Sequence, residues 1–166
     1  YGFNHDEAVI CFEQAIAIDA DCVMAYWGLA YAIGPNYNKI WEMFEPQERI
    51  SSLATAHKAI ADGLARESGT KLERALLEAL SARYPHDPET EEYGPYNDAF
   101  VEVMHPIYQM HKNDLDVASV FAESLMGRTP WELWDVKIGV PAEDASAEEA
   151  QAVLETAFAS DKAAWT

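Results

Sequence analysis

The chain has 166 residues, of which 49% are hydrophobic, and a formal net charge of −18 at pH 7. This length and apolar content suffice for a sizeable core, and no apolar run approaches the roughly 18 residues of a membrane span. The acidic balance argues against nucleic acids and anionic membrane surfaces as partners, because both require basic side chains. A basic peptide or a basic protein face is compatible with this charge.

Capping, spacing and helix-breaking residues predict helices throughout the first half of the chain. Asn4 and Glu7 have the spacing of a capping box, which predicts a first helix that ends near Asp19. Gly34-Pro35 ends a second helix, and residues 36–38 follow as a loop. The expected helical segments of this half are 4–19, 21–33, a short helix over 39–44, 51–67 and 70–84. Pro46 suits a first helical turn, so a helix is expected to begin near residues 46–48.

The second half is predicted to be helical as well, after one acidic loop. Before that loop, Thr70 and Glu73 have the spacing of another capping box, at the start of the helix over 70–84. Residues 85–94 are acidic and rich in helix breakers, which indicates a loop. Helices are predicted over 95–112, over 115–126 and from about 146 onward, with a kink or a shifted start at Pro106. Residues 127–141 are irregular, and no segment alternates with period two, so no sheet is expected.

One helical pattern occurs twice, at positions that lie 142 residues apart. Six identical residues recur, Glu7, Ala8, Glu13, Ala15, Ala17 and Asp19 as Glu149, Ala150, Glu155, Ala157, Ala159 and Asp161. Phe12 aligns with Leu154, so both copies read Ala-x3-(Phe/Leu)-x2-Ala. A unit this short cannot bury its own apolar face and must stack on similar units. We therefore expect Phe12 and Leu154 to hold equivalent buried positions.

This skeleton resembles the second helix of a tetratricopeptide repeat, and Ala25–Tyr31 resembles the first helix of the repeat that follows. Five segments further resemble the N-terminal part of a longer bacterial and fungal family of tetratricopeptide-repeat proteins, namely Tyr1–Ala8, Ala25–Gly28, Gly34–Asn38, Ala122–Met126 and Pro130–Trp134. The resemblance implies an all-α solenoid of about seven main antiparallel helices. We expect one such solenoid over 1–166, as a fragment of a longer array. The resemblance supplies no catalytic residues.

Aromatic and amide side chains predict a partner-binding surface on the second helix and the loop after it. First helices line the concave face of such solenoids, where side chains not needed for packing can contact a peptide. The candidate residues are Tyr26, Trp27, Tyr31, Asn36, Tyr37 and Asn38. Aromatic residues at this spacing are also typical of a core, so packing is the alternative for them. The expected function is a protein-interaction module that binds a peptide or partner protein.

Part of a metal-dependent enzyme, completed by further repeats, is the alternative function. Its candidate residues are His5, at a helix start, and Glu123, within an apolar helix. His5 and Cys11 do not share a helix face, and the sequence lacks a phosphate loop and a nucleophile elbow. No catalytic residue, metal site or cofactor is therefore predicted. Cys11 and Cys22 are expected to be reduced and packed, which favours a cytoplasmic location.

The first and last predicted helices each lack one neighbour in the expected repeat pattern. Apolar side chains such as Ile10, Ile16 and Phe158 would then be left in water. Exposed apolar surface of this kind favours association. We therefore expect a homo-oligomer that forms through the terminal helices.

Overall fold

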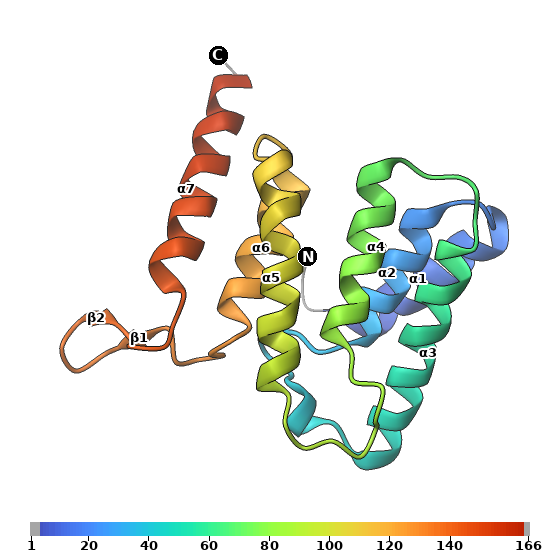
Figure 1. The fold of residues 1–166 in the computed structure, drawn as a ribbon, viewed down its shortest axis with the longest axis horizontal. Helices are drawn as coiled ribbons and strands as arrows, with labels where there is room; N and C mark the ends of the chain where they lie inside the picture. The colour runs from blue at the N-terminus through green and yellow to red at the C-terminus, as the bar shows by residue number, and fades with distance from the viewer. Residues whose placement is uncertain (1–3, 165–166) are drawn as a thin grey trace. The chain divides into compact units, whose positions relative to one another are not determined.

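The computed structural model describes residues 4–164, with side chains described for 4–160. Within that range it contains seven α-helices, which confirms the all-α prediction (Figure 1). The helices are α1 (His5–Ile18), α2 (Val23–Ile33), α3 (Pro46–Leu64), α4 (Lys71–Arg83), α5 (Gly94–Met110), α6 (Leu115–Met126) and α7 (Ala147–Ala164). A 3-10 turn, Trp41–Met43, lies where the short helix over 39–44 was expected.

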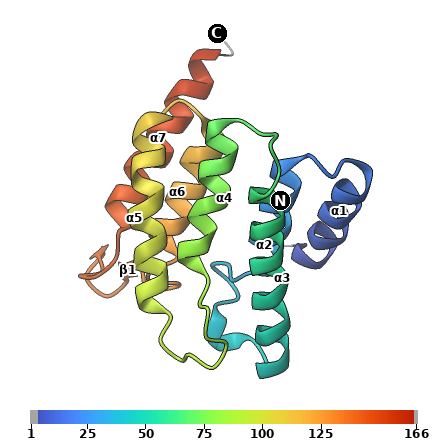
Figure 2. The same cartoon turned by 45° about the vertical axis from the view of Figure 1, so that its right-hand side comes forward.

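The chain forms two compact units, Tyr1–Tyr96 and Asn97–Thr166. In the first unit α2 packs against α1, α3 and α4, and α3 also packs against α4 (Figure 2). In the second unit α7 packs against α6, and the Tyr108 ring of α5 stacks on Phe121 of α6 at 4.9 Å. One continuous tetratricopeptide-like solenoid over 1–166 stays a prediction.

Helix ends follow the sequence signals in part. Thr70 and Glu73 form the predicted capping box at the start of α4, with the Thr70 hydroxyl accepting from the Glu73 N–H at 3.2 Å. Within the described residues, Asn4 makes no side-chain capping bond to α1, so that box is wrong. α5 runs through Pro106, which lacks the N–H needed for the hydrogen bond to the preceding turn.

Residues 127–141 contain a small hairpin that the sequence did not predict. β1 (Trp134–Asp135) pairs antiparallel with β2 (Val140–Pro141). The Asp135 carboxylate accepts a hydrogen bond from the Lys137 N–H at 2.9 Å, and Gly139 has a φ of +72°, which favours glycine. The expectation of no sheet is wrong here, because two residue pairs are too few to show period-two alternation.

Glycines allow close packing on both sides of α2. A Cβ at Gly28 would lie 2.2 Å from a ring carbon of Phe12 in α1, and one at Gly63 of α3 would lie 2.8 Å from the Cβ of Tyr26. Phe12 itself is half-buried, as is Leu154 of α7. The two aligned residues are therefore less buried than expected, although each lies on the apolar side of its helix.

An aromatic cluster fixes the segment between α2 and α3. Trp41 is 2% exposed, and its ring centroid lies 4.7 Å from Phe44, 6.1 Å from Tyr84 and 6.2 Å from Tyr93. The phenol of Tyr93 donates to the Thr90 carbonyl at 2.7 Å. Aromatic contacts of this kind add to the free energy of burial, so the cluster holds the chain that leads from α2 into α3.

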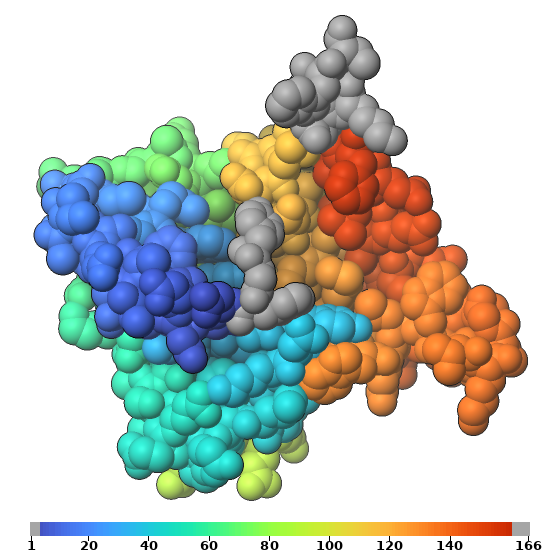
Figure 3. Space-filling view, turned by 180° about the vertical axis from the view of Figure 1, so that it is seen from behind, coloured from blue at the N-terminus to red at the C-terminus, as the bar shows by residue number. Residues whose placement is uncertain are grey.

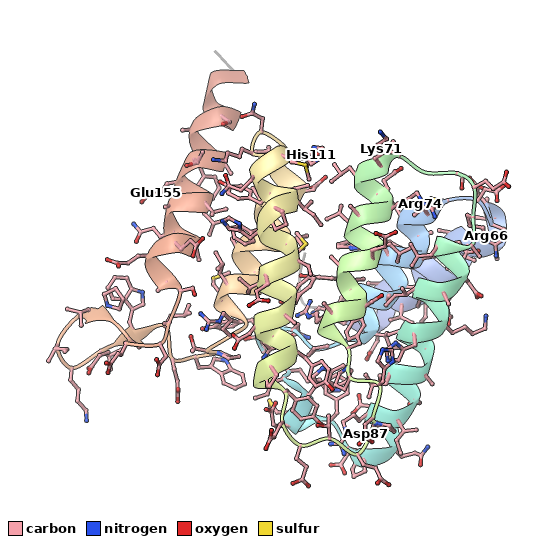
Figure 4. All side chains as sticks on the ribbon, in the orientation of Figure 1. Arg66, Lys71, Arg74, Asp87, His111 and Glu155 are labelled. Atoms are coloured by element: carbon pink, nitrogen blue, oxygen red, sulfur yellow. The ribbon has the colours of Figure 1, made fainter. Side chains whose placement is uncertain are left out.

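The turn between α3 and α4 is closed by an arginine. The Arg74 guanidinium donates to the carbonyls of Leu64 at 2.8 Å and Arg66 at 2.6 Å. The last carbonyls of a helix have no partner within the helix, so these bonds satisfy groups that would otherwise need water. Figure 4 shows Arg66, Lys71 and Arg74 at this end of the helix pair.

Candidate functional site

A cleft of about 490 Å³ lies in the first unit, where the start of α1, the end of α2, the loop after α2 and the start of α3 meet. Its lining joins an apolar floor to a polar rim, and consists of Asn4, His5, Asp6, Val9, Ala32, Ile33, Gly34, Asn36, Asn38, Lys39, Phe44, Glu48, Ser51 and Ser52. Figure 3 shows α1, in dark blue, beside the cyan and teal surface that follows α2. Four separate segments of the chain thus build one concave site.

The loop at the rim is shaped by Asn36. Its carboxamide oxygen accepts from the backbone N–H groups of Asn38 at 2.9 Å and Lys39 at 3.1 Å. Asn36 and Lys39 also exchange two backbone hydrogen bonds, at 3.0 and 3.1 Å. Asparagine is favoured in such turns because its side chain bonds to the backbone two residues on. Asn36 therefore positions the loop, and Asn38 is the exposed amide at the cleft.

Two residues at the end of α4 hold this loop against the core. The buried Arg83 donates to the Pro35 carbonyl at 3.0 Å, and its guanidinium lies 5.0 Å from the Tyr31 ring centroid. The Tyr84 hydroxyl donates to the Ala30 carbonyl at 2.7 Å. Because buried polar groups are costly unless hydrogen-bonded, these contacts fix the end of α2 and the start of the loop.

The charged residues at the cleft leave it slightly negative. Two carboxylates, Asp6 and Glu48, and one ammonium, Lys39, line it. Lys39 forms an ion pair with Glu48, and its Nζ lies 4.3 Å from the Phe44 ring centroid. Asp6 is exposed and begins the rim on the α1 side. A cationic group or a hydrogen-bond donor is thus better matched to this cleft than an anion.

The structure separates the six predicted binding residues, all of which it describes. Asn36 and Asn38 line the cleft. Tyr26 is 3% exposed and its hydroxyl donates to the Ala20 carbonyl at 3.0 Å, so it is a core residue. Trp27 and Tyr31 stack on one side of α2 with centroids 4.7 Å apart, and both are half-buried. Tyr37 is also half-buried.

Sequence reasoning missed the residues that α1 and α3 bring to the cleft. Asp6, Glu48 and Ser51 lie on helices that the sequence predicts separately, and nothing in their local spacing relates them to Asn38. His5 lines the cleft too, although the sequence suggests for it a metal ligand or a capping or surface role. A map of which helix pairs pack together is needed to find this set.

The residues considered for a metal do not come together. Within the part of the chain that the structure describes, no group of three or more His, Cys, Asp and Glu side chains could hold a metal ion. Glu123 is half-buried on α6 in the second unit. Both cysteines are free thiols, but Cys11 is exposed, so the expectation that it is packed is wrong.

Comparison with known proteins gives no relative of the chain. No protein family, no curated protein and no solved structure matches it. None of the helices in the described range is long and apolar enough to cross a membrane. The resemblance to tetratricopeptide repeats thus continues to rest on the sequence pattern.

Proposed function

We propose that the chain is a tetratricopeptide-like protein-interaction module, and that its first unit binds an extended peptide or a segment of a partner protein. The cleft at Asn38 is the observation that carries this proposal. It combines an apolar floor, from residues such as Val9 and Ile33, with amide and carboxylate groups at its rim. Binding sites of this kind pair apolar area with a few polar groups that fix orientation.

The polar groups suit a peptide main chain. The exposed Asn38 carboxamide supplies both a donor and an acceptor, which a peptide bond can match with its C=O and N–H. Because Lys39 pairs with Glu48, Asp6 is the carboxylate at the cleft that favours a lysine or arginine side chain in the bound segment. A basic partner would also be attracted over a distance by the net charge of −18.

The packing of the first unit supports the repeat-like part of the proposal. α1 pairs with α2 and α3 with α4, and glycines stand where α2 meets its neighbours, at Gly28 and Gly63. Small residues at such contacts are what a stack of helical hairpins needs for close approach. A cytoplasmic location belongs to the same proposal, because Cys11 and Cys22 are free thiols.

Selection from a random peptide library on the immobilised chain tests the binding function. We expect enriched peptides to carry lysine or arginine, and Asn38→Ala or Asp6→Asn to weaken their binding by about fivefold or more. Asn113→Ala and Asp144→Asn are matched controls, because both positions are exposed and lie in the second unit. Acidic selected peptides, or equal binding by all four variants, would reject the proposal.

A further inference from the structure

The second unit has an apolar groove of its own. Leu133 and Trp134 of the hairpin segment and Leu154 and Phe158 of α7 line a depression of about 350 Å³. Trp134 is 47% exposed and Phe158 is 63% exposed, although both are large apolar side chains. Contiguous exposed apolar surface on a folded unit is typical of interaction sites.

The first unit shows how a helix with the same skeleton is covered. α1 and α7 share the skeleton Ala-x3-(Phe/Leu)-x2-Ala, with Phe12 at the position of Leu154 and Ile16 at that of Phe158. In the first unit α2 packs against α1, with Gly28 against the Phe12 ring. Cys11 lies outside this contact and is exposed.

In α7 the covered side only partly matches the covered side of α1. Val153, which aligns with Cys11, is 5% exposed where α7 packs against α6. Leu154 and Phe158, which align with Phe12 and Ile16, line the open groove instead. The aligned alanines Ala150 and Ala157 are buried in α7, and Leu154 is half-buried as Phe12 is, so the open part of the shared face in α7 is the edge at Leu154 and Phe158.

We propose that this groove binds an α-helix of a partner protein, with glycine or alanine opposite Leu154 and lysine or arginine beside Glu155. The helical form and the small residue follow from the way α2 covers Phe12 with Gly28. The basic residue follows from charge, because Glu155 is the one charged residue among the described residues that line the groove. Figure 4 labels Glu155 on α7. Helix binding in an apolar groove is a common recognition mode.

A labelled synthetic peptide of residues 21–34, flanked by lysines, is the probe, because it carries the glycine and apolar pattern of α2. Fluorescence anisotropy with the full chain should give saturable binding. Phe158→Asp should weaken it by about tenfold or more. Val136→Asp is the matched control, because this apolar residue is 89% exposed on the hairpin and outside the groove. Circular dichroism of both variants establishes that they fold.

Two altered peptides test the stated chemistry. Glutamate flanks in place of lysine should weaken binding because of Glu155, and leucine in place of the central glycine should weaken it because Leu154 needs the space. Equal binding by these peptides would reject the partner chemistry. Asn38→Ala lies in the other unit and should leave unchanged the part of peptide binding that Phe158→Asp removes, so failure here is separable from failure of the proposed cleft function.

Three results would overturn the proposal. The first is absence of saturable binding. The second is binding that Phe158→Asp does not affect. This would be seen if the peptide replaced α2 in its contact with α1 instead of occupying the groove. The third is concentration-dependent mass in light scattering that Phe158→Asp abolishes while the peptide does not bind. The groove would then be an interface between two copies, as the expected homo-oligomer requires.

Discussion

The phenol oxygen of Tyr84 lies 2.5 Å from the point that a Cβ on Gly34 would occupy. Gly34 has a φ of −83°, which any residue can adopt, so the requirement at this position is for space. The same Tyr84 hydroxyl bonds to the Ala30 carbonyl. The missing side chain at Gly34 therefore lets the end of α4 reach the end of α2, at the point where the loop to the cleft begins.

Gly34→Ala should lower the free energy of unfolding by about 1–3 kcal/mol, because the added methyl group forces the buried Tyr84 to move. Urea unfolding measures the change. Gly94→Ala is the control, since among the described residues nothing lies within 4 Å of a Cβ there. Equal stability of the two variants would show that Tyr84 adjusts freely.

Phe12 and Gly28 should behave as a coupled pair. Phe12→Ala should cost about 2 kcal/mol, because it removes a half-buried ring from the contact between α1 and α2. Gly28→Ala should destabilise the wild-type chain, but it should be neutral or stabilising beside Phe12→Ala, since alanine is the better helix former. Additive changes in a double-mutant cycle would contradict the observed contact.

Arg74→Ala should lower the free energy of unfolding by about 1–3 kcal/mol, because the carbonyls at the end of α3 lose a charged donor. Arg74→Lys should recover only part of this loss, since one ammonium cannot reproduce the guanidinium geometry. Lys71→Ala is the control, because Lys71 is exposed and lies on α4, the helix that also carries Arg74. Thermal unfolding followed by circular dichroism compares the three variants.

Stability should fall above about pH 10, and Tyr93 should account for part of the fall. Burial raises the pKa of Tyr93 above 10.0, an effect that Arg49 opposes and that Glu42 and Glu91 reinforce. Above this pH the unfolded chain loses the phenol proton before the folded chain does, so the free energy of unfolding decreases as pH rises. Urea midpoints on both sides of pH 10 should show a smaller decrease for Tyr93→Phe. An identical decrease in the wild-type chain and in Tyr93→Phe would show that Tyr93 does not contribute to the loss of stability.

Most of the helices could be predicted because their signals are local. Thr70 with Glu73 and Gly34-Pro35 mark helix ends within a few residues. α3 starts at Pro46, where proline at a first helical turn was the predicted signal, ahead of the amphipathic pattern that begins at residue 51. The hairpin was missed because its turn depends on Asp135 and Gly139 rather than on a strand pattern.

The candidate site was only partly predictable, for a geometric reason. Asn36 and Asn38 lie in one loop and could be proposed from turn chemistry, but Asp6 and Glu48 reach the same cleft from two other helices. The side of α2 that faces the core also depends on its neighbours. Tyr26 and Trp27 are adjacent in sequence, yet Tyr26 is buried and Trp27 is half-exposed to solvent.

Several of the cations in this chain are engaged in holding helices together. Arg74 bonds to helix carbonyls, Arg83 is buried, and Arg128 bonds to Asp98 at 2.7 Å and to Ser146 at 2.8 Å. The chain has 11 Lys and Arg residues and 29 Asp and Glu residues, so most of its carboxylates have no basic side chain to neutralise them. Mobile ions shorten the range of the repulsion between these carboxylates to about 10 Å at 0.1 M salt. Added salt should therefore raise the melting temperature, and the chain should be least stable at the lowest salt concentration.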